Sequence, residues 1–176
     1  MERRSSGIIL FSEEQRFRQP LLRILIFILA GMSWLLLIYQ IFIKKPFGSD
    51  PAPNAMVWTI WLVFGIAFPI FFLALRMTTE VREDAVVIRF IPGNRRSIRL
   101  EEIQRFEVRE YRPLREYGGW GIQHSRRHGI AYSVSGNRGV QLVLKNGKRI
   151  LIGSQEPDRL AGALRTALRK HGQVEL

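Results

Sequence analysis

The organisation of this chain is decided by two uncharged stretches, ILIFILAGMSWLLLIYQIFI at residues 24–43 and AMVWTIWLVFGIAFPIFFLAL at residues 55–75. At about 1.5 Å per residue each would form a helix of roughly 30 Å, the thickness of the hydrocarbon core of a bilayer. Neither stretch carries polar residues at helical spacing, as a surface helix of a soluble protein would. The two stretches therefore predict a transmembrane helical hairpin over residues 24–75.

A signal peptide and a buried helical hairpin of a soluble protein are the alternatives for these stretches. The first stretch is longer than the apolar region of a signal peptide, and no small-x-small cleavage pattern precedes Lys44. Both lengths match the bilayer rule, which favours membrane spans. The connector KKPFGSDPAPN, residues 44–54, returns the chain but is too short to hold a domain, and Pro69 is expected to kink the second helix, which membranes tolerate.

The orientation of the hairpin follows from the basic residues in its short flanks, because cytoplasmic flanks are rich in lysine and arginine. The connector offers only Lys44 and Lys45, whereas arginines stand before the first span at 3, 4, 16, 18 and 23 and after the second at 76, 82 and 89. We therefore expect a basic cytoplasmic segment over residues 1–23, with both termini on the cytoplasmic side of the cell membrane.

The composition of the whole chain narrows the classes of partner and chemistry. Among 176 residues, 27 Lys and Arg against 15 Asp and Glu give a formal net charge of +12. Such a charge attracts nucleic acid, anionic lipid or acidic protein surfaces. The chain contains no cysteine, which excludes disulfides, thiolate metal sites and thiol nucleophiles.

In residues 77–176 the long apolar stretches give way to short segments in which apolar and polar residues alternate, and this pattern indicates strands. Asn146-Gly147 joins two of these segments and is a strong signal for a two-residue hairpin. Seven strands are predicted, at TTEVRED (78–84), AVVIRFI (85–91), RRSIRL (95–100), IQRFEVREY (103–111), GIAYSV (129–134), VQLVLK (140–145) and KRILIGS (148–154).

A helix is predicted after these strands. Pro157 suits the first helical position, and Gly172 suits a C-terminal cap. Between them, one apolar face is formed at helical spacing by Leu160, Ala161, Leu164, Ala167 and Leu168. Seven strands closed by one terminal helix is the layout of a pleckstrin-homology-like (PH-like) barrel. We therefore predict an α+β membrane protein, with the hairpin followed by a PH-like seven-stranded barrel and a C-terminal capping helix over residues 77–176.

Three segments carry a resemblance to a known group of proteins: WGIQ at 120–123, AYSVSGNRGVQL at 131–142 and LIGSQEP at 151–157. They are similar to an uncharacterised branch of the bacterial PH-domain membrane proteins, which have two membrane helices and a PH-like domain. The pattern of that branch is a Trp-Gly-Ile turn, a Gly-x-x-Gly-Val strand start and Ile-Gly-Ser-Gln-x-Pro before the helix. The resemblance implies a fold and a membrane location, and it implies no catalytic residues.

Catalytic, cofactor and metal sites are not predicted. SGNRG at 135–139 lacks the GxxxxGK[ST] pattern of a P-loop and has strands on both sides, so a hairpin turn is the simpler interpretation. His124 and His128 lie four apart, but the glycines around them disfavour a helix, and no cysteine or acidic cluster would complete a metal shell. No G-x-S-x-G elbow, HExxH motif or nucleophile–base set is present, so we predict a protein that is not an enzyme.

The candidate contacts with a ligand or membrane are Arg115, Trp120, Arg126, Arg127 and Arg138. Trp120 lies between glycines, and its large ring either covers the mouth of the barrel or reaches a membrane interface or ligand groove. The arginines supply positive charge, and each one near an anionic leaflet contributes about 1 kcal/mol of attraction.

Two functions remain open on these observations. The first is a non-catalytic binding module held at the inner leaflet, which binds anionic lipid headgroups or a partner membrane protein. The alternative is a structural subunit that forms a homo-oligomer through barrel edges and transmembrane helices. Nucleic acid is not expected as a partner, because the chain has no recognised binding motif and the hairpin confines it to a membrane.

Overall fold

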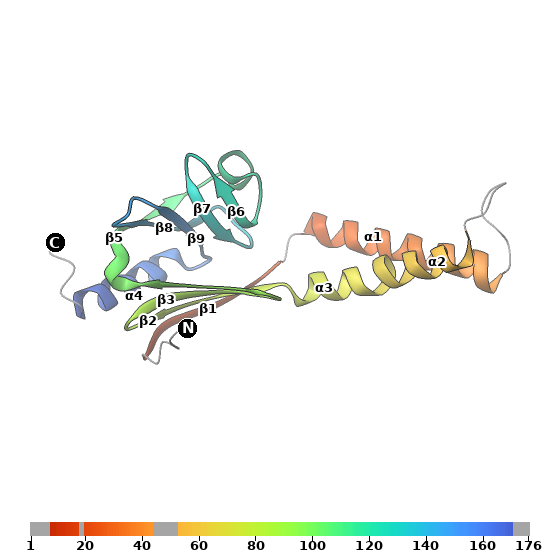
Figure 1. Cartoon of the computed structure of the whole chain (residues 1–176), viewed down its shortest axis with the longest axis horizontal. Helices are drawn as coiled ribbons and strands as arrows, with labels where there is room; N and C mark the ends of the chain where they lie inside the picture. The colour runs from red at the N-terminus through yellow and green to blue at the C-terminus, as the bar shows by residue number, and fades with distance from the viewer. Residues whose placement is uncertain (1–7, 18–19, 44–52, 171–176) are drawn as a thin grey trace. The chain divides into compact units, whose positions relative to one another are not determined.

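The computed structural model describes residues 8–17, 20–43 and 53–170, and the chain forms two compact units. The first unit contains Met1–Arg16 and Arg76–Leu176, and the second contains Phe17–Leu75. Figure 1 shows the second unit as a pair of helices and the first as sheets with a C-terminal helix. The connector at 44–52 and the predicted cap at Gly172 lie outside the described residues.

The second unit is a hairpin of two long apolar helices. The first helix consists of α1 (Pro20–Leu37) and a π-helical turn, Ile38–Phe42, and the second of α2 (Asn54–Ile60), a π-helical segment, Trp61–Ala67, and α3 (Phe68–Ala74). Leu22–Phe42 and Asn54–Ala74 are long and apolar enough to cross a membrane, with mean hydropathies of 2.3 and 2.2. The prediction of two apolar helices is confirmed.

Small and aromatic residues form the contact between the two helices. A Cβ added to Gly65 would lie 2.9 Å from Ser33 Oγ and 3.0 Å from the Trp61 ring, so only glycine permits this approach. The Trp61 ring packs edge-on against Trp34 and Trp58, with centroids 5.2 and 5.6 Å apart. The π-helical segment ends at Ala67, and Pro69 is the second residue of α3, so the helix continues through the proline.

The first sheet of the larger unit has four antiparallel strands in the order β1-β2-β3-β4. These strands are β1 (Ile9–Arg16), β2 (Arg76–Arg82), β3 (Ala85–Ile91) and β4 (Asn94–Arg99). Its inner face includes Met77, Val81, Ile88 and Ile98, each at most 1% exposed. In β2 and β4 these residues have polar neighbours, as in half-buried strands, whereas β3 is buried on both faces over residues 85–88.

The second sheet has five strands in the order β5-β8-β9-β7-β6. They are β5 (Ile103–Glu110), β6 (Gly121–Ser125), β7 (Gly129–Ser133), β8 (Arg138–Leu144) and β9 (Arg149–Gly153). Only the β7–β9 pair is parallel among the pairings of the described residues. The Asn146-Gly147 hairpin is confirmed, since Gly147 has φ of 79° between β8 and β9.

Helix α4 (Pro157–Lys170) completes the core of this unit. It contacts β1 and β2 of the first sheet and β5 and β8 of the second. Its buried apolar residues include the whole predicted face: Leu160, Ala161, Leu164, Ala167 and Leu168. The prediction of a terminal helix packed on the strands is therefore confirmed.

The prediction of a seven-stranded barrel requires correction. The described residues form nine strands in two separate sheets, and neither sheet closes on itself. All seven predicted strands are present, and β1 and β6 are additional. Strand β6 lies in the glycine-flanked stretch around His124, where short length and flanking glycines mask the strand pattern.

Strand β1 changes the domain boundaries that the sequence analysis drew at residues 1–23 and 77–176. Gln15 Nε2 donates to the Gly153 carbonyl at 2.9 Å. The Glu13 carboxylate accepts from Ser154 Oγ at 2.6 Å and from the Gln155 N–H at 2.8 Å. Residues 9–16 therefore belong to the first unit, and the apolar hairpin is an insertion between β1 and β2.

Candidate functional site

The candidate site lies on the outer face of the second sheet, opposite the face that packs on α4. The register of the sheet places Arg105, Val143 and Arg149 in one row across β5, β8 and β9. Glu107, Gln141 and Leu151 form the next row. Because side chains alternate along a strand, both rows point to the same face, away from buried Leu142 and Ile150.

A short segment after β5 covers part of this outer face. The π-helical turn Pro113–Tyr117 folds back over the sheet and ends at Gly118, which has φ of 82°. Tyr111, Tyr117, Ala131 and Leu151 form a buried cluster beneath it. The two tyrosine rings meet edge to face, with centroids 6.1 Å apart. The segment thus anchors a small second core on the sheet and places Glu116 beside it.

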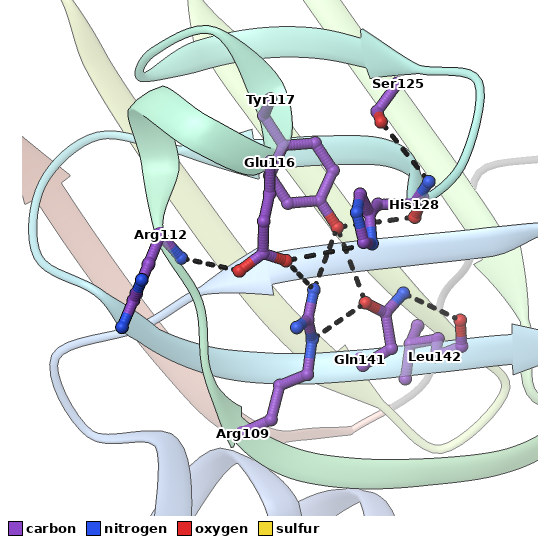
Figure 2. Close-up of polar contacts among 8 residues, drawn as sticks. All are labelled: Arg109, Arg112, Glu116, Tyr117, Ser125, His128, Gln141 and Leu142. Carbon is purple, nitrogen blue, oxygen red and sulfur yellow. Dashed lines mark hydrogen bonds and ion pairs between the residues drawn. The ribbon is translucent and has the colours of Figure 1, made fainter.

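Glu116 organises the polar side chains next to this tyrosine cluster (Figure 2). Its Oε1 accepts the Arg112 N–H at 2.7 Å, and its Oε2 accepts a bond from Arg109 Nη2 at 2.8 Å. His128 Nδ1 lies 3.8 Å from the same Oε2 atom. Glu116 therefore links its own turn to β5 and to the turn that precedes β7.

The guanidinium of Arg109 is held in place by three acceptors. Besides Glu116, its Nε donates to Gln141 Oε1 at 3.1 Å and its Nη2 to Tyr117 Oη at 3.2 Å. Tyr117 Oη in turn donates to the His128 carbonyl at 3.3 Å. Because Gln141 is only 4% exposed, this network forms the buried floor of the site.

The protonation states follow from this network. Burial alone would raise the pKa of Glu116, but the Arg112 N–H and the Arg109 guanidinium outweigh burial and lower the pKa below its usual value. Burial acts to lower the pKa of Arg109, but its bonds to Glu116 and Tyr117 raise the pKa overall. Burial also raises the pKa of Tyr117. At neutral pH the site therefore contains an ionised Glu116, a charged Arg109 and a neutral Tyr117.

A polar cavity of about 230 Å³ opens beside this network. Three arginines line it, Arg105, Arg109 and Arg149, together with a single acidic residue, Glu107. The remaining lining residues are His128, Gln141 and Val143. The side chains supply hydrogen-bond donors and positive charge, which is the chemistry that holds an anion.

The five arginine and tryptophan candidates from the sequence separate into different places. Trp120 and Arg138 lie where β6 and β8 begin, beside the end of β9. Arg126 and Arg127 lie in the turn between β6 and β7, at the opposite end of the sheet and next to His128 of the cavity. Arg115 is exposed in the turn that covers the tyrosine cluster.

Trp120 is only partly buried, and its side chain is held by a hydrogen bond. Its side chain is partly exposed, and its indole N–H donates to the Gly136 carbonyl at 3.0 Å. Gly136 has φ of 77° in the segment between β7 and β8, so a turn is present at SGNRG as predicted. The prediction that it is a hairpin turn is wrong, because β9 lies between β7 and β8 in the sheet. Arg138, the first residue of β8, follows this turn and pairs with Asp158 at 3.5 Å. Trp120 and Arg138 therefore share one edge of the unit, held together through the Gly136 turn.

Sequence reasoning missed the residues of the cavity. Arg105, Glu107 and Arg109 alternate along a strand, a pattern that is typical of a solvated face. The signal that distinguishes them is the glycine-bounded turn after β5, which folds Glu116 and Tyr117 onto that face. Across residues 8–17, 20–43 and 53–170, no group of three His, Cys, Asp or Glu side chains is arranged to hold a metal ion.

Comparison with known proteins places the chain in one family. No curated protein matches the chain. A protein family described as a family of unknown function (DUF6141) matches over residues 1–171, a range that includes β1, both apolar helices and both sheets. The chain belongs to this family of unknown function.

Proposed function

We propose that this protein is a membrane-anchored, non-catalytic binding module. Its apolar hairpin spans the cell membrane, and its soluble unit, a PH-like domain, lies at the inner leaflet and binds anionic lipid headgroups. The proposal rests chiefly on one observation: Trp120 and Arg138 lie at the end of the soluble unit from which the chain leaves for both apolar helices.

The sheet register supports a membrane anchor with both ends on one side. Arg16, the last residue of β1, is the partner of Arg76, the first residue of β2. Since α1 begins at Pro20 and α3 ends at Ala74, both apolar helices join the soluble unit through two neighbouring strands. Two paired strands cannot lie on opposite sides of a bilayer, so this pairing favours two full spans over one. The arginines near these junctions favour the cytoplasmic side.

The placement of α4 supports a PH-like fold. Two sheets of strongly alternating strands share one core, and α4 contacts both of them. This is the relation between sheets and C-terminal helix that the PH-like layout requires. The open edges and the additional β1 strand distinguish the unit from a closed barrel.

The end of the unit near the junctions carries the groups that suit a headgroup layer. Gln15, one residue before the junction at Arg16, bonds to Gly153 at the end of β9. Gly153 is paired with Gly139, next to Arg138, and the Trp120 indole is bonded to the nearby Gly136 turn. An indole with one polar edge and an arginine is the combination found at membrane–water interfaces.

Homo-oligomerisation is the second candidate function, and one observation favours it. The hairpin unit has an apolar groove of about 410 Å³, lined by Leu29, Met32, Leu36, Ile60 and Phe64, among others. A groove of this kind accepts apolar side chains of another transmembrane helix through van der Waals packing. In this case the hairpin would assemble copies of the chain, and lipid would be only the solvent.

The proposal is tested with the full chain in nanodiscs. Because the chain has no cysteine, one introduced cysteine carries an environment-sensitive dye at a single position. Asn137→Cys reports on the end near the junctions, and Lys148→Cys is the matched control, since β8, roughly 20 Å long, separates these positions. We expect a blue shift at position 137 in anionic nanodiscs and not in neutral ones, with no shift at position 148.

Trp120→Ala and Arg138→Gln are expected to reduce the shift at position 137, whereas Arg165→Gln, an exposed arginine of α4, leaves it unchanged. Equal shifts at both labelled positions, or none at either, would contradict the proposed lipid contact.

The second candidate function, homo-oligomerisation, is tested in the same nanodiscs. The number of chains per disc is counted by photobleaching of the dye, and two or more copies per disc favour assembly through the hairpin.

A further inference from the structure

The cavity on the outer face of the second sheet has no role in the lipid contact proposed above. We infer that it binds a phosphate group, a tetrahedral dianion, through Arg105, Arg149 and Arg109. This inference concerns a different site from the edge formed by Trp120 and Arg138, so binding at each site is tested separately. Only the argument about the source of the phosphate rests on the proposed function.

The first argument is the convergence of two arginines that lack carboxylate partners. Arg105 and Arg149 flank half-buried Val143 from the strands on either side of β8. Their backbones are separated by two strand spacings, about 10 Å, which is a distance that two arginine side chains can bridge around one small anion. Within the part of the chain that the structure describes, neither guanidinium forms an ion pair with a carboxylate.

The second argument is that the third arginine is already fixed. Arg109 Nε and Nη2 are bonded to Gln141, Glu116 and Tyr117, and its side chain is only 25% exposed. Arg109 lines the cavity, and its Nη1 group takes no part in these bonds. A donor held in place before binding loses little conformational entropy when the anion arrives.

The third argument is the size of the cavity and the charge of the residues that line it. A volume of about 230 Å³ is below the range of roughly 300–1,000 Å³ that is typical of pockets for drug-sized ligands, so a small group fits better than a whole nucleotide. Arg109 is paired with Glu116, so Arg105 and Arg149 against one exposed carboxylate, Glu107, leave the lining positive. Guanidinium groups donate paired hydrogen bonds to phosphate oxygens, which favours a dianion with several equivalent oxygens.

The fourth argument concerns the source of the phosphate. Arg149 opens β9, and Gly153, which is bonded to β1 near the hairpin, closes it. The row of Arg105 and Arg149 therefore lies at the end of the sheet away from the junctions, roughly 13 Å along the strand. A phosphate dissolved in the cytoplasm reaches this end directly, whereas a lipid phosphate is held at the bilayer.

The test uses the full chain in detergent micelles and isothermal titration with inorganic phosphate and with glycerol 3-phosphate at low ionic strength. We expect saturable binding by the natural chain. Arg105→Gln and Arg149→Gln each remove a charged donor without emptying a core position, and each is expected to raise Kd roughly tenfold or more. Arg165→Gln is the matched control, and it is expected to leave Kd unchanged.

A second arm separates the two sources of phosphate. The full chain is reconstituted in nanodiscs containing phosphatidic acid or only phosphatidylcholine, and glycerol 3-phosphate is titrated into each. Equal Kd values in the two discs support a soluble source, and competition by phosphatidic acid that disappears in Arg149→Gln supports a lipid source at the same site. The inference is overturned if neither soluble phosphate nor phosphatidic acid binds, or if Arg165→Gln weakens binding as much as Arg149→Gln.

Discussion

The two faces of the second sheet are built from the same strands but serve different purposes. On the inner face, Val140 and Leu142 of β8 are fully buried, and Leu164 of α4 is buried in the same core. On the outer face, Gln141 of the same strand is bonded to Arg109, and Val143 lines the polar cavity. The difference teaches that alternate residues of one strand take different roles: one set packs the core, and the next lines the cavity for which we propose anion binding.

The sharpest test of this division is a pair of truncations on neighbouring residues of β8. Leu142→Ala removes a side chain that is 0% exposed on the inner face, so we expect the free energy of unfolding to fall by about 2–5 kcal/mol. Val143→Ala, on the half-buried outer face, is expected to cost about 1 kcal/mol or less. Urea unfolding of the full chain in detergent, monitored by limited proteolysis, measures the free energy of unfolding of both variants. Similar losses would show that the outer face also carries the stability of the sheet.

A glycine-to-alanine pair tests how closely the outer face is packed. An added Cβ at Gly153 would lie 2.8 Å from Ser133 Cβ and 2.9 Å from Tyr111 Oη, so Gly153→Ala is expected to cost about 1–3 kcal/mol of stability. Gly162 in α4 has no atom within 4 Å of an added Cβ, so Gly162→Ala is expected to stabilise the protein by roughly 0.5–1 kcal/mol. Thermal unfolding detects the opposite signs. If Gly153→Ala also stabilised the protein, the residues around Gly153 would have to move aside at little cost in free energy.

The smallest expected change in stability is that of a Glu116 variant, and it depends on pH. Glu116→Gln removes the charge that accepts bonds from Arg109 and Arg112, so we expect a loss of about 1–2 kcal/mol at pH 7. Because the folded-state pKa of Glu116 is lowered, this contribution is present above the unfolded pKa near 4.5 and is lost as the pH falls through the folded value.

The measurement for Glu116 is the difference in unfolding free energy between the natural chain and Glu116→Gln from pH 7 to pH 3. The difference is expected to shrink below pH 4.5. Glu110→Gln is the control, since Glu110 is exposed at the end of β5 and forms no ion pair with another described residue. A difference that stays constant with pH would mean that Glu116 acts through its shape and not through its charge.

Sequence reasoning reached those parts of the fold that depend on local periodicity. Seven strands, α4 and both apolar helices follow from alternation, helical spacing and length within each segment. Strand β1 was missed because its partner lies beyond the hairpin: Phe11 is paired with Val81. A pattern within residues 9–16 carries no information about a partner so distant along the chain.

The candidate site was harder to predict for a related reason. Its members come from β5, the turn after it, the turn before β7, β8 and β9, and only the strand register brings them into adjacent rows. The sequence identified basic residues near Trp120, but it did not reveal that Arg126 and Trp120 lie at opposite ends of β6. Register and sheet order are long-range properties, and a one-residue shift would turn the arginines to the other face.

The insertion of the hairpin between β1 and β2 also sets an order of events during synthesis. Strand β1 leaves the ribosome first, and its partner β2 follows only after residues 17–75 have been made, a delay on the order of seconds at ordinary translation rates. The first sheet cannot be completed before the second apolar helix has emerged. Pairing of β1 with β2 therefore has to wait for synthesis of the hairpin that separates them.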